Sequence, residues 1–592
     1  MLSIFDYIVI VFYFGFTLSL GFVFKKLNEG GTDYFAGGRK MNWWLLGASS
    51  FVSNFSAWSF TGAAGMAYSF GVVVFSITVV DIVGFLVSYF WFAGAFRRLR
   101  LVTAMDAVRL RFGKANEQLF TWLQVLTAFF GGAVWLVGLS ILLSTSFGFP
   151  QIPVVVFCTI TITVMTMVGG KWAVSGSDFV QTVLLSGISV AVCALTIHHV
   201  GGLAPLLEQL PKEHGHFFRP LGSIKYDWLY ILTALIWGVY QKNSILFGAA
   251  KYIAAKDDRH AKKSVLVPLI GYILLPVCWF LPAMAATFIV PDLMERYATF
   301  SNPSEAAYIA VCLEVLPKGL LGLTIAGLFA ATMSSMDTAL NVNAGFLVKN
   351  FYQPIFRKNA SEEEQLAAGH VATVFCGIVM LVLAIAMVTR GKVSLFDAYL
   401  YLNAYIQAPL TVALFLSVMI KRTPAWAGWS TILIGVLSTV LIYDVASTDG
   451  AQAWLTAAFG EWFANYMVTN KFTFTNLFTV PLCSLFFWST KKFYREVPRT
   501  EAYRAELDDF ARRLKTPVDF EQEVGNDNSA QQERIMGTLA LVYGGFVALG
   551  ILIPNPMSGR LAIAFTASVL LVVGGVLVRI SKKNKPGRET HG

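Results

Sequence analysis

Oxygen-bearing side chains share one face of the segment "GLFAATMSSMDTALNVNAG" (327–345), which lies inside an otherwise apolar stretch. The face is made of small and polar residues that recur at helical spacing, namely Ala331, Ser334, Ser335, Thr338 and Asn341. Asp337 lies at the edge of this face. A carboxylate at bilayer depth is costly unless it is paired or functional. The segment is therefore the first candidate for a functional site.

Two further polar interruptions break apolar stretches. "GASSFVSNFSAWSFTGAAG" (47–65) and "TALIWGVYQKNSILFGAA" (233–250) are five predicted spans apart, so they run in opposite directions. Lipid-exposed irregular backbone is forbidden, so such breaks line a cavity or pack on protein. Paired interrupted helices at matching positions of two halves indicate an inverted-repeat transporter, whose unwound backbone binds ions and solute. Close helix packing through glycine and serine is the alternative for either segment alone.

Membrane-spanning helices are the elements that must position these residues. Hydrophobic residues make up 56% of the 592-residue chain, charged residues only 14%, and the mean hydropathy is +0.62, which excludes an ordinary soluble protein. Apolar runs of about 20 residues span a hydrocarbon core. Fifteen such runs are expected near 5–24, 43–69, 72–96, 118–145, 152–168, 178–198, 228–249, 265–290, 317–348, 367–388, 394–419, 425–446, 472–489, 535–553 and 561–580.

The placement of basic residues predicts the orientation of these spans. With the N terminus outside, 35 of the 45 Lys and Arg residues fall in inner loops, nine fall in outer loops, and Lys242 lies within a span. This bias follows the positive-inside rule, so we expect an external N terminus, a cytoplasmic C terminus and a cell-membrane location. The net charge of +10 is then a topology signal and predicts no nucleic-acid partner.

Three motifs resemble one family of transporters. "TDYFAGGRKMNWWLLGASSFVSNFSAWSFTG" (32–62), "GGKWAVSGSDFVQ" (169–181) and "GLFAATMSSMDTALN" (327–341) are similar to the sodium/solute symporter family, which includes the sodium/glucose, proline and sialic acid symporters. The resemblance extends over about residues 5–490. It implies an all-α polytopic membrane protein with the leucine-transporter-like five-plus-five inverted repeat, one extra N-terminal helix and about four extra C-terminal helices.

The resemblance also divides the chain. The expected parts are 1–42 with the extra N-terminal helix and a cytoplasmic loop, 43–200 as the first repeat, 201–227 as an external loop, 228–420 as the second repeat, 421–490 with two additional helices, 491–534 as a charged cytoplasmic linker, and 535–592 as a terminal helix pair with a basic tail. An interfacial helix is expected in the linker, followed by a flexible Gly/Asn/Ser/Gln-rich tail.

A sodium site is implied between the broken first core helix and the eighth core helix. Its ligands would be the backbone carbonyls of Val52, Phe55 and Ala331 and the hydroxyls of Ser334 and Ser335. Sodium is a hard cation, and such oxygens replace its water with little fixed charge. Helix packing, with the serine hydroxyls bonded to the carbonyl four residues earlier, is the structural alternative.

Some family members bind a second sodium ion. Asp178 matches the aspartate of that site, and Ser334, Asp337 and Thr338 match its other positions. Asp337 departs from the sialic acid type, which has serine there. Two carboxylates would bind the cation more tightly or share a proton; alternatively, Asp337 bonds to a neighbouring helix and the second site is absent.

The solute site is expected on four spans. Its candidate residues are Asn54, Ser56, Trp58 and Ser59 on the second span, Thr78 and Asp81 on the third, Thr233 on the seventh, and Tyr401, Asn403 and Gln407 on the eleventh. Asp81 either faces an amine or hydroxyl of the solute or pairs with Lys242 as a structural ion pair.

The function implied is sodium-coupled symport of a small polar organic solute, a sugar, amino acid or carboxylate, by alternating access. Sodium would be co-transported, and the solute and the lipid bilayer are the other expected partners. A sensory module with the same fold and a channel are the rival classes, and no kinase motif follows residue 490. No nucleotide-binding loop or nucleophile–base set predicts an enzyme.

Overall fold

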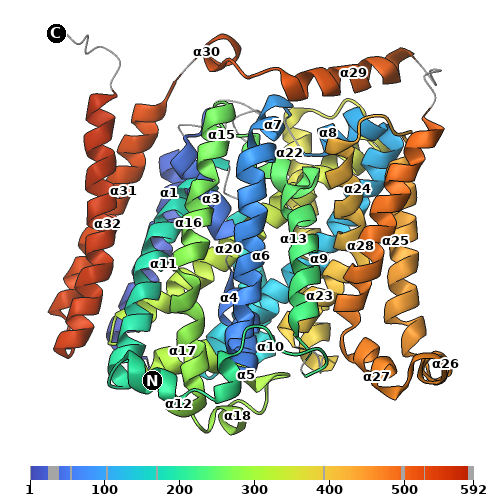
Figure 1. Ribbon diagram of the computed structural model, residues 1–592. Coiled ribbons are helices and arrows are strands. Elements are labelled where there is room, and N and C mark those ends of the chain that lie inside the picture. The colour runs from blue at the N-terminus through green and yellow to red at the C-terminus, as the bar shows by residue number, and fades with distance from the viewer. Residues whose placement is uncertain are drawn as a thin grey trace.

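Long apolar helices stand side by side in the computed structural model, with their axes running between two ends (Figure 1). The structure describes residues 2–24, 39–53, 56–101, 104–167, 171–223, 225–390, 394–494, 501–525 and 527–584. Over these residues the regular structure is helical, and Met41 and Ala255 form an isolated β-bridge. One end carries α29 and α30 and is called the strap end; the other carries α12, α18, α26 and α27 and is called the loop end.

The first half of the core follows α1 (Ile4–Phe24). It consists of α3 (Trp43–Ser53), α4 (Ala57–Phe60), α5 (Gly62–Phe70), α6 (Phe75–Val87), α7 (Ala93–Arg98), α8 (Ala104–Phe112), α9 (Lys114–Phe147), α10 (Gln151–Thr166) and α11 (Lys171–His199). The chain then passes through α12 (Leu203–Gln209) at the loop end. Gly71 has a positive φ of 68° at the turn between α5 and α6, a conformation that glycine adopts without strain.

The second half runs from residue 228 to residue 419. It consists of α13 (Trp228–Asn243), α14 (Ala250–Tyr252), α15 (Asp258–Ser264), α16 (Leu266–Leu274), α17 (Pro276–Ile289), α18 (Leu293–Arg296), α19 (Ala307–Val315), α20 (Leu320–Phe346), α21 (Gln353–Ile355), α22 (Glu362–Arg390), α23 (Leu395–Leu402) and α24 (Ala408–Met419). Short turns continue some of these helices, among them η6 (Ile245–Ala249), η7 (Pro303–Ala306) and η9 (Asn403–Gln407).

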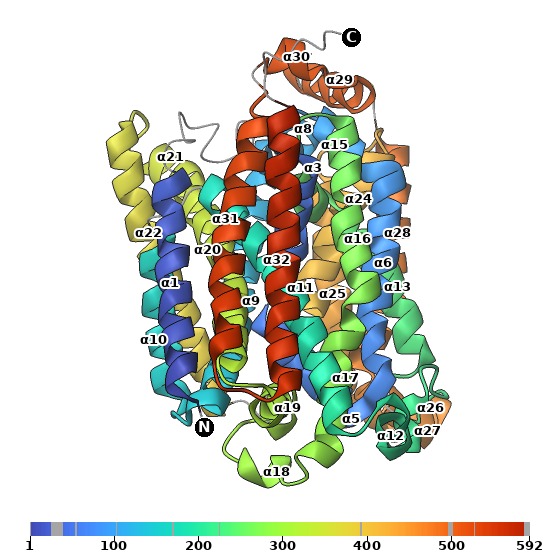
Figure 2. The same ribbon diagram turned by 90° about the vertical axis from the view of Figure 1, so that its left-hand side faces the viewer.

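Eight further helices complete the chain. They are α25 (Ala427–Tyr443), α26 (Asp449–Phe459), α27 (Glu461–Thr469), α28 (Lys471–Ser489), α29 (Glu501–Lys515), α30 (Phe520–Glu523), α31 (Ser529–Leu549) and α32 (Met557–Lys583). The pair α31–α32 packs on α11, as the view in Figure 2 shows. Helix α31 starts inside the segment that the sequence assigned to the linker.

Corresponding helices of the two halves come together in two groups. In one group α3 and α6 pack with α13 and α16; in the other, α9 and α10 pack with α20 and α22. Each group takes two helices from each half at equivalent positions in the order, which is the arrangement expected of an inverted repeat. Helix α11 contacts α3 and α20, and so joins the two groups.

Eleven helical stretches of the described residues are long and apolar enough to cross a membrane, and two apolar helices are shorter, Ile4–Thr17 and Gln151–Thr166. The run Ala57–Arg98 counts once among the eleven, although the sequence predicts a span on each side of Gly71. The all-helical membrane architecture is confirmed, and the count of fifteen spans stays a prediction.

The segment 501–525, here called the strap, lies across its end of the bundle (Figure 1). Phe510 is fully buried, and α29 packs on α7 and α8. The guanidinium of Arg100 donates to Glu523 at 2.7 Å and to the carbonyl of Pro517 at 2.8 Å. The expected interfacial helix therefore packs on the protein's own helices α7 and α8.

Candidate cation and solute sites

The first core helix is broken where the polar interruption predicts it. Helix α3 ends at Ser53, α4 begins at Ala57, and Ser56 between them has extended backbone angles (φ −146°, ψ 175°). Asn54 and Phe55, expected at this break, lie outside the described residues. The last turn of an α-helix leaves carbonyl groups without a partner in the helix. The break therefore supplies oxygens in the middle of the bundle.

Helix α20 runs past this break without interruption. It carries the oxygen-rich face of the sequence, and Ala331, Ser334 and Ser335 are all at most 4% exposed. The amide of Ala57 donates to the Thr332 hydroxyl at 2.7 Å, which ties the start of α4 to α20. Val52, the expected ligand on the other side of the break, is fully buried.

The two serines on α20 make different hydrogen bonds. Ser335 donates to the carbonyl of Ala331 at 3.3 Å, the backbone bond of the helix-packing alternative. Ser334 instead donates to Asp178 of α11. Of the three expected sodium ligands on α20, the Ala331 carbonyl and the Ser335 hydroxyl therefore lie side by side, and the Ser334 hydroxyl is bonded to a carboxylate.

Asp178 joins three helices. Its side chain is fully buried, and it accepts hydrogen bonds from Ser334 on α20 and from Ser49 on α3 at 2.5 Å. Thr182, one turn along α11, donates to the backbone carbonyls of Asp178 at 2.8 Å and of Ala48 at 3.1 Å. Ser49 was visible in the sequence as one of several serines, but nothing in its spacing distinguished it as a partner of Asp178.

Asp337 has a separate partner. It is half-buried and accepts a hydrogen bond from Thr166 at the end of α10, while Thr338 beside it is half-buried as well. Asp178 accepts hydrogen bonds from Ser49 and Ser334, whereas Asp337 accepts one from Thr166. Thr166 was not singled out by the sequence, because α10 carries several threonines at similar spacing.

Asp81 forms an ion pair with Lys242. The carboxylate of Asp81 on α6 lies 2.8 Å from the Lys242 ammonium on α13, and both side chains are nearly buried. The ammonium also lies 5.3 Å from the centre of the Phe85 ring, a cation–π distance. Of the two sequence alternatives for Asp81, the structure contains the ion pair.

An aromatic cluster surrounds Trp58 on α4. Its indole ring lies 4.8 Å from the ring of Tyr399 and 5.9 Å, nearly parallel, from that of Phe396. The indole nitrogen donates to the carbonyl of Leu395 at 3.3 Å. Trp58 is therefore held against α23, the start of the tenth core helix.

Amide side chains adjoin this cluster. Gln407 accepts a hydrogen bond from Gln241 of α13 at 2.7 Å, and both residues are buried. Asn403 is fully buried and donates to the carbonyl of Tyr399 at 2.8 Å. Gln241 belongs to the second polar interruption, although the break in α13 falls after it, at Ser244.

The remaining expected solute residues differ in their burial and in their hydrogen bonds. Ser56, Ser59 and Thr78 are buried, and their hydroxyls make no hydrogen bond within the part of the chain that is described. Thr233 donates to the carbonyl of Leu229 in its own helix at 3.0 Å. Tyr401 is 39% exposed and lies 5.3 Å from the ring of Tyr443, so the structure does not bring it to the Trp58 cluster.

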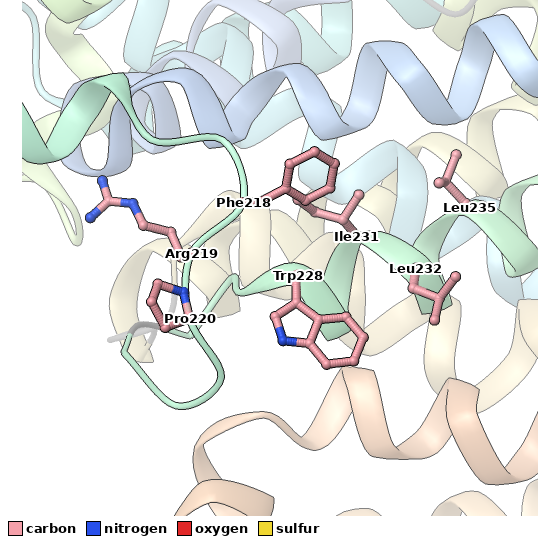
Figure 3. Close-up of a pocket in the computed structure, with 7 residues that line it drawn as sticks. All are labelled: Phe218, Arg219, Pro220, Trp228, Ile231, Leu232 and Leu235. Atoms are coloured by element: carbon pink, nitrogen blue, oxygen red, sulfur yellow. The ribbon is translucent and has the colours of Figure 1, made fainter.

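A surface pocket of about 580 Å³ lies elsewhere, at the loop end of α13. Figure 3 shows its lining, which is apolar apart from Arg219: Phe218, Arg219, Pro220, Trp228, Ile231, Leu232 and Leu235. The Arg219 guanidinium donates to the backbone carbonyls of Glu213 and His216 and points away from the apolar side chains. This pocket lacks the set of polar groups that orients a polar solute.

The broken first core helix, the oxygen-bearing face of α20 and both groups of four helices lie within a stretch of the chain that matches a family model. The model of the sodium:solute symporter family matches residues 34–435, more than half of the chain. The chain belongs to the sodium:solute symporter family. As a member of this family it is a membrane transporter and not an enzyme, and the sensor and channel alternatives are not favoured.

Characterised members of the family align along most of the chain. Sodium/glucose cotransporter 4 of Mus musculus is 26% identical over 75% of this chain and 70% of its own length. The sodium/sialic acid symporter SiaT of Proteus mirabilis is 23% identical over 74% and 88%. Sodium/myo-inositol cotransporter 2 of Homo sapiens is 25% identical over 74% and 70%.

Solved structures of symporters share the fold. A substrate-bound, outward-open sodium-coupled sialic acid symporter superposes with a TM-score of 0.63 at 21% identity, covering 81% of this chain and 98% of the symporter. Mhp1, a nucleobase-cation-symport-1 family transporter, gives a TM-score of 0.51 at 15% identity over 80% and 98%. These likenesses confirm the leucine-transporter-like fold of this sodium:solute symporter.

Proposed function

We propose that this sodium:solute symporter carries a small polyhydroxylated solute, a sugar or a polyol, by alternating access. The coupling to sodium is supported by one observation, the break between α3 and α4, which lies beside the hydroxyl-bearing face of α20. A cation there can use free carbonyls and hydroxyls instead of water. The solute class is supported by the chemistry around Trp58 and by the sugar and inositol carriers among the relatives.

The first sodium ion binds to the carbonyls of Val52, Phe55 and Ala331 and to the hydroxyls of Ser334 and Ser335. The proximity of Ser335 Oγ to the Ala331 carbonyl, 3.3 Å, supports this set, because a small rotation of the hydroxyl would let both oxygens face one cation. Burial of Val52, Ala331, Ser334 and Ser335 excludes water, which strengthens the binding of a small cation.

A second cation adjoins the first at Asp178. A fully buried carboxylate that accepts hydrogen bonds from the hydroxyls of Ser49 and Ser334 supplies hard, anionic oxygens, which are the ligands that a small cation prefers. Ser334 bonds to Asp178 and also belongs to the first set, so the two sites share it. Asp337 and Thr338 lie at the edge of this second site.

The solute lies between α4, α6, α13 and α23. An aromatic ring such as Trp58 covers the apolar face of a sugar, while its hydroxyls bind amides and hydroxyls. Gln407, Ser56, Ser59 and Thr78 supply such groups, together with Asn54 and Asn403. The ion pair of Asp81 and Lys242 offers both an acceptor and a donor, and Thr233 is another residue of α13, the helix that carries Lys242. Tyr401 lies at the periphery of this proposed solute site.

Orientation follows from the charge pattern. The strap end, which holds α7, α15 and α29, is cytoplasmic, and the loop end is external. The 35 basic residues expected inside and the nine outside support this assignment.

Uptake into proteoliposomes tests the proposal. Sodium-driven uptake of labelled sugars and polyols is expected, with amino acids and carboxylates as the comparison set. Ser334→Ala and Ser335→Ala should each raise the sodium concentration for half-maximal transport roughly 5- to 30-fold, since one lost oxygen ligand is worth about 1–2 kcal/mol. Ser430→Ala is the matched control, because this buried hydroxyl bonds only within α25 at 2.8 Å. Unchanged sodium dependence in both variants would refute the site.

A further inference from the structure

Glu305 is a buried carboxyl group in a loop between two helices. It belongs to η7, which follows α18 and precedes α19, and it is only 2% exposed. Residue 305 lies outside the membrane-crossing helices. None of the sequence motifs included it. A glutamate is rarely buried to this extent unless it is bound to a specific partner.

The partner of Glu305 is the first residue of α23. The Leu395 amide donates to its Oε1 at 2.5 Å, and Asn302 supports the same oxygen at 3.5 Å. The first amides of a helix have no acceptor within the helix. Ser394 caps α23 by accepting from the Asp397 amide at 3.1 Å, and Glu305 satisfies a second amide from a different segment.

Trp58 contacts Leu395 as well, at its carbonyl group. Its indole nitrogen donates to the carbonyl of Leu395 at 3.3 Å, and its ring packs on Phe396 and Tyr399 of α23. Glu305 and Trp58 therefore meet at one peptide segment, the start of the tenth core helix. Displacement of that segment would move the acceptor of the indole.

Two glycines let these elements approach closely. A Cβ atom at Gly62 would lie 2.9 Å from the Trp58 indole nitrogen and 3.1 Å from Leu395 Cβ. A Cβ atom at Gly65 would lie 3.0 Å from Ser304 Oγ and 3.1 Å from Glu305 Cγ. At these two glycines α5 lies directly against η7 and α23, with no side chain between them. The start of α23 therefore has little room to shift.

We propose that Glu305 is a positioning residue for the solute site. It fixes the start of α23 against α4 and α5, and through the Leu395 carbonyl it sets the orientation of the Trp58 indole. This inference rests on the proposed function, in which Trp58 covers one face of the solute.

The protonation of Glu305 makes glutamine its conservative replacement. Burial raises the pKa of the Glu305 carboxyl to about 8, the Leu395 amide and Asn302 lower it, and the charge of Asp397 raises it. Asp397 is itself paired with Lys225 and accepts from the Tyr226 hydroxyl at 2.9 Å. The neutral form is therefore the common one at pH 7, and Glu305→Gln keeps an oxygen acceptor for the Leu395 amide.

Hydrogen exchange and transport kinetics test this role together. In the full-length protein, Glu305→Ala should speed amide exchange in the peptide 394–402 and raise the solute KM about 5-fold, the effect of one lost hydrogen bond, without changing half-maximal sodium. Glu305→Gln should retain the parental exchange and KM. The control is Glu314→Ala, an exposed glutamate in the adjacent α19 that pairs with Arg296 at 3.2 Å.

A double-mutant cycle separates positioning from a general loss of stability. On a Trp58→Phe background, which lacks the indole donor, Glu305→Ala should raise KM no further, because both changes act on the same contact. Additive effects, or parental exchange in Glu305→Ala, would overturn the inference. The exchange measurement needs no solute, so a parent protein without sodium-driven uptake would overturn the proposed function and leave the Leu395 contact measurable.

Discussion

Asp178 and Asp337 are both carboxylates on membrane-spanning helices, but their surroundings differ. Asp178 is fully buried between α3, α11 and α20, whereas Asp337 is half-buried and bonded to Thr166. The two lie within electrostatic range of each other. A cation near Asp178 would relieve both the burial of that charge and its repulsion of Asp337.

We therefore expect unequal effects of the two aspartates on coupling. Asp178→Asn should weaken sodium cooperativity, because it removes the charge that balances the second cation while keeping the size of the side chain. Asp337→Ser should keep transport, since serine still offers an oxygen to Thr166. The Hill coefficient for sodium and the charge moved per solute are the measurements. A coefficient near one in the parent, unaffected by either change, would mean a single sodium site.

Glu305 predicts a pH dependence of stability. Its pKa is raised from 4.5 to about 8, so the folded protein binds this proton more tightly than the unfolded chain. The contribution to the free energy of unfolding is fully present below pH 4.5 and falls as pH rises toward about 8. The melting temperature of the parent relative to Glu305→Gln should therefore decrease between about pH 5.5 and 8 and then level off. A constant difference across this range would contradict the prediction.

At the scale of elements, the strap connects parts that are far apart in the sequence. Arg98 pairs with Asp258 at 2.5 Å, and Arg100 binds the strap with its guanidinium while its own φ is 56°, a strained value for a non-glycine residue. Beyond the strap, Gln532 at the start of α31 donates to the Lys40 carbonyl at 2.8 Å and accepts from the Asn42 amide at 3.1 Å. The C-terminal extension thus contacts the segment that leads into α3.

Loss of the Arg100 side chain should weaken the contact between the strap and the core. Arg100→Ala removes the donors to Glu523, Thr516 and Pro517, and we expect the free energy of unfolding to fall by about 1–3 kcal/mol. Arg512→Ala is the control, because Arg512 is 75% exposed and pairs only with Asp509 three residues away. Thermal unfolding in detergent gives both values. Equal melting temperatures for the two variants would show that the contacts of Arg100 with the strap contribute no stability.

At the scale of the whole molecule, the two ends of the bundle must face opposite sides of the membrane. Helix α1 begins at the loop end and α32 ends at the strap end (Figure 1). The sequence places most basic residues in the loops that we expect on the side of the strap, and the positive-inside rule assigns such loops to the cytoplasm. In this proposed orientation, sodium and solute enter from the loop end.

Cysteine labelling checks this orientation. Leu2→Cys should react with a membrane-impermeant reagent added outside intact cells, and Lys583→Cys, an exposed position at the end of α32, only after access to the inside. The physical reason is the excess of basic residues in the loops expected inside. Labelling of Leu2→Cys only from the inside would refute both the orientation and the fifteen-span count.

Local patterns in the sequence were sufficient for the helices, the break in the first core helix and the oxygen face of α20. Each of these depends on residues close together in the chain, through the 3.6-residue period and the cost of polar groups in lipid. The family and its fold also followed from contiguous motifs. The break after α13 falls at Ser244, inside the second polar interruption, while earlier polar residues such as Gln241 stay within the helix because another helix supplies a partner.

Only the tertiary structure decided which helices place their polar groups together. The pairing of Ser49 with Asp178, of Thr166 with Asp337 and of Lys242 with Asp81 depends on how each helix is rotated about its axis and on the depth at which it packs. Those two quantities are set by side-chain packing between segments that lie far apart in the chain, which no local period encodes. For the same reason the pairing of Glu305 with Leu395 was found only in the folded structure, where the segment between α18 and α19 packs on the start of α23.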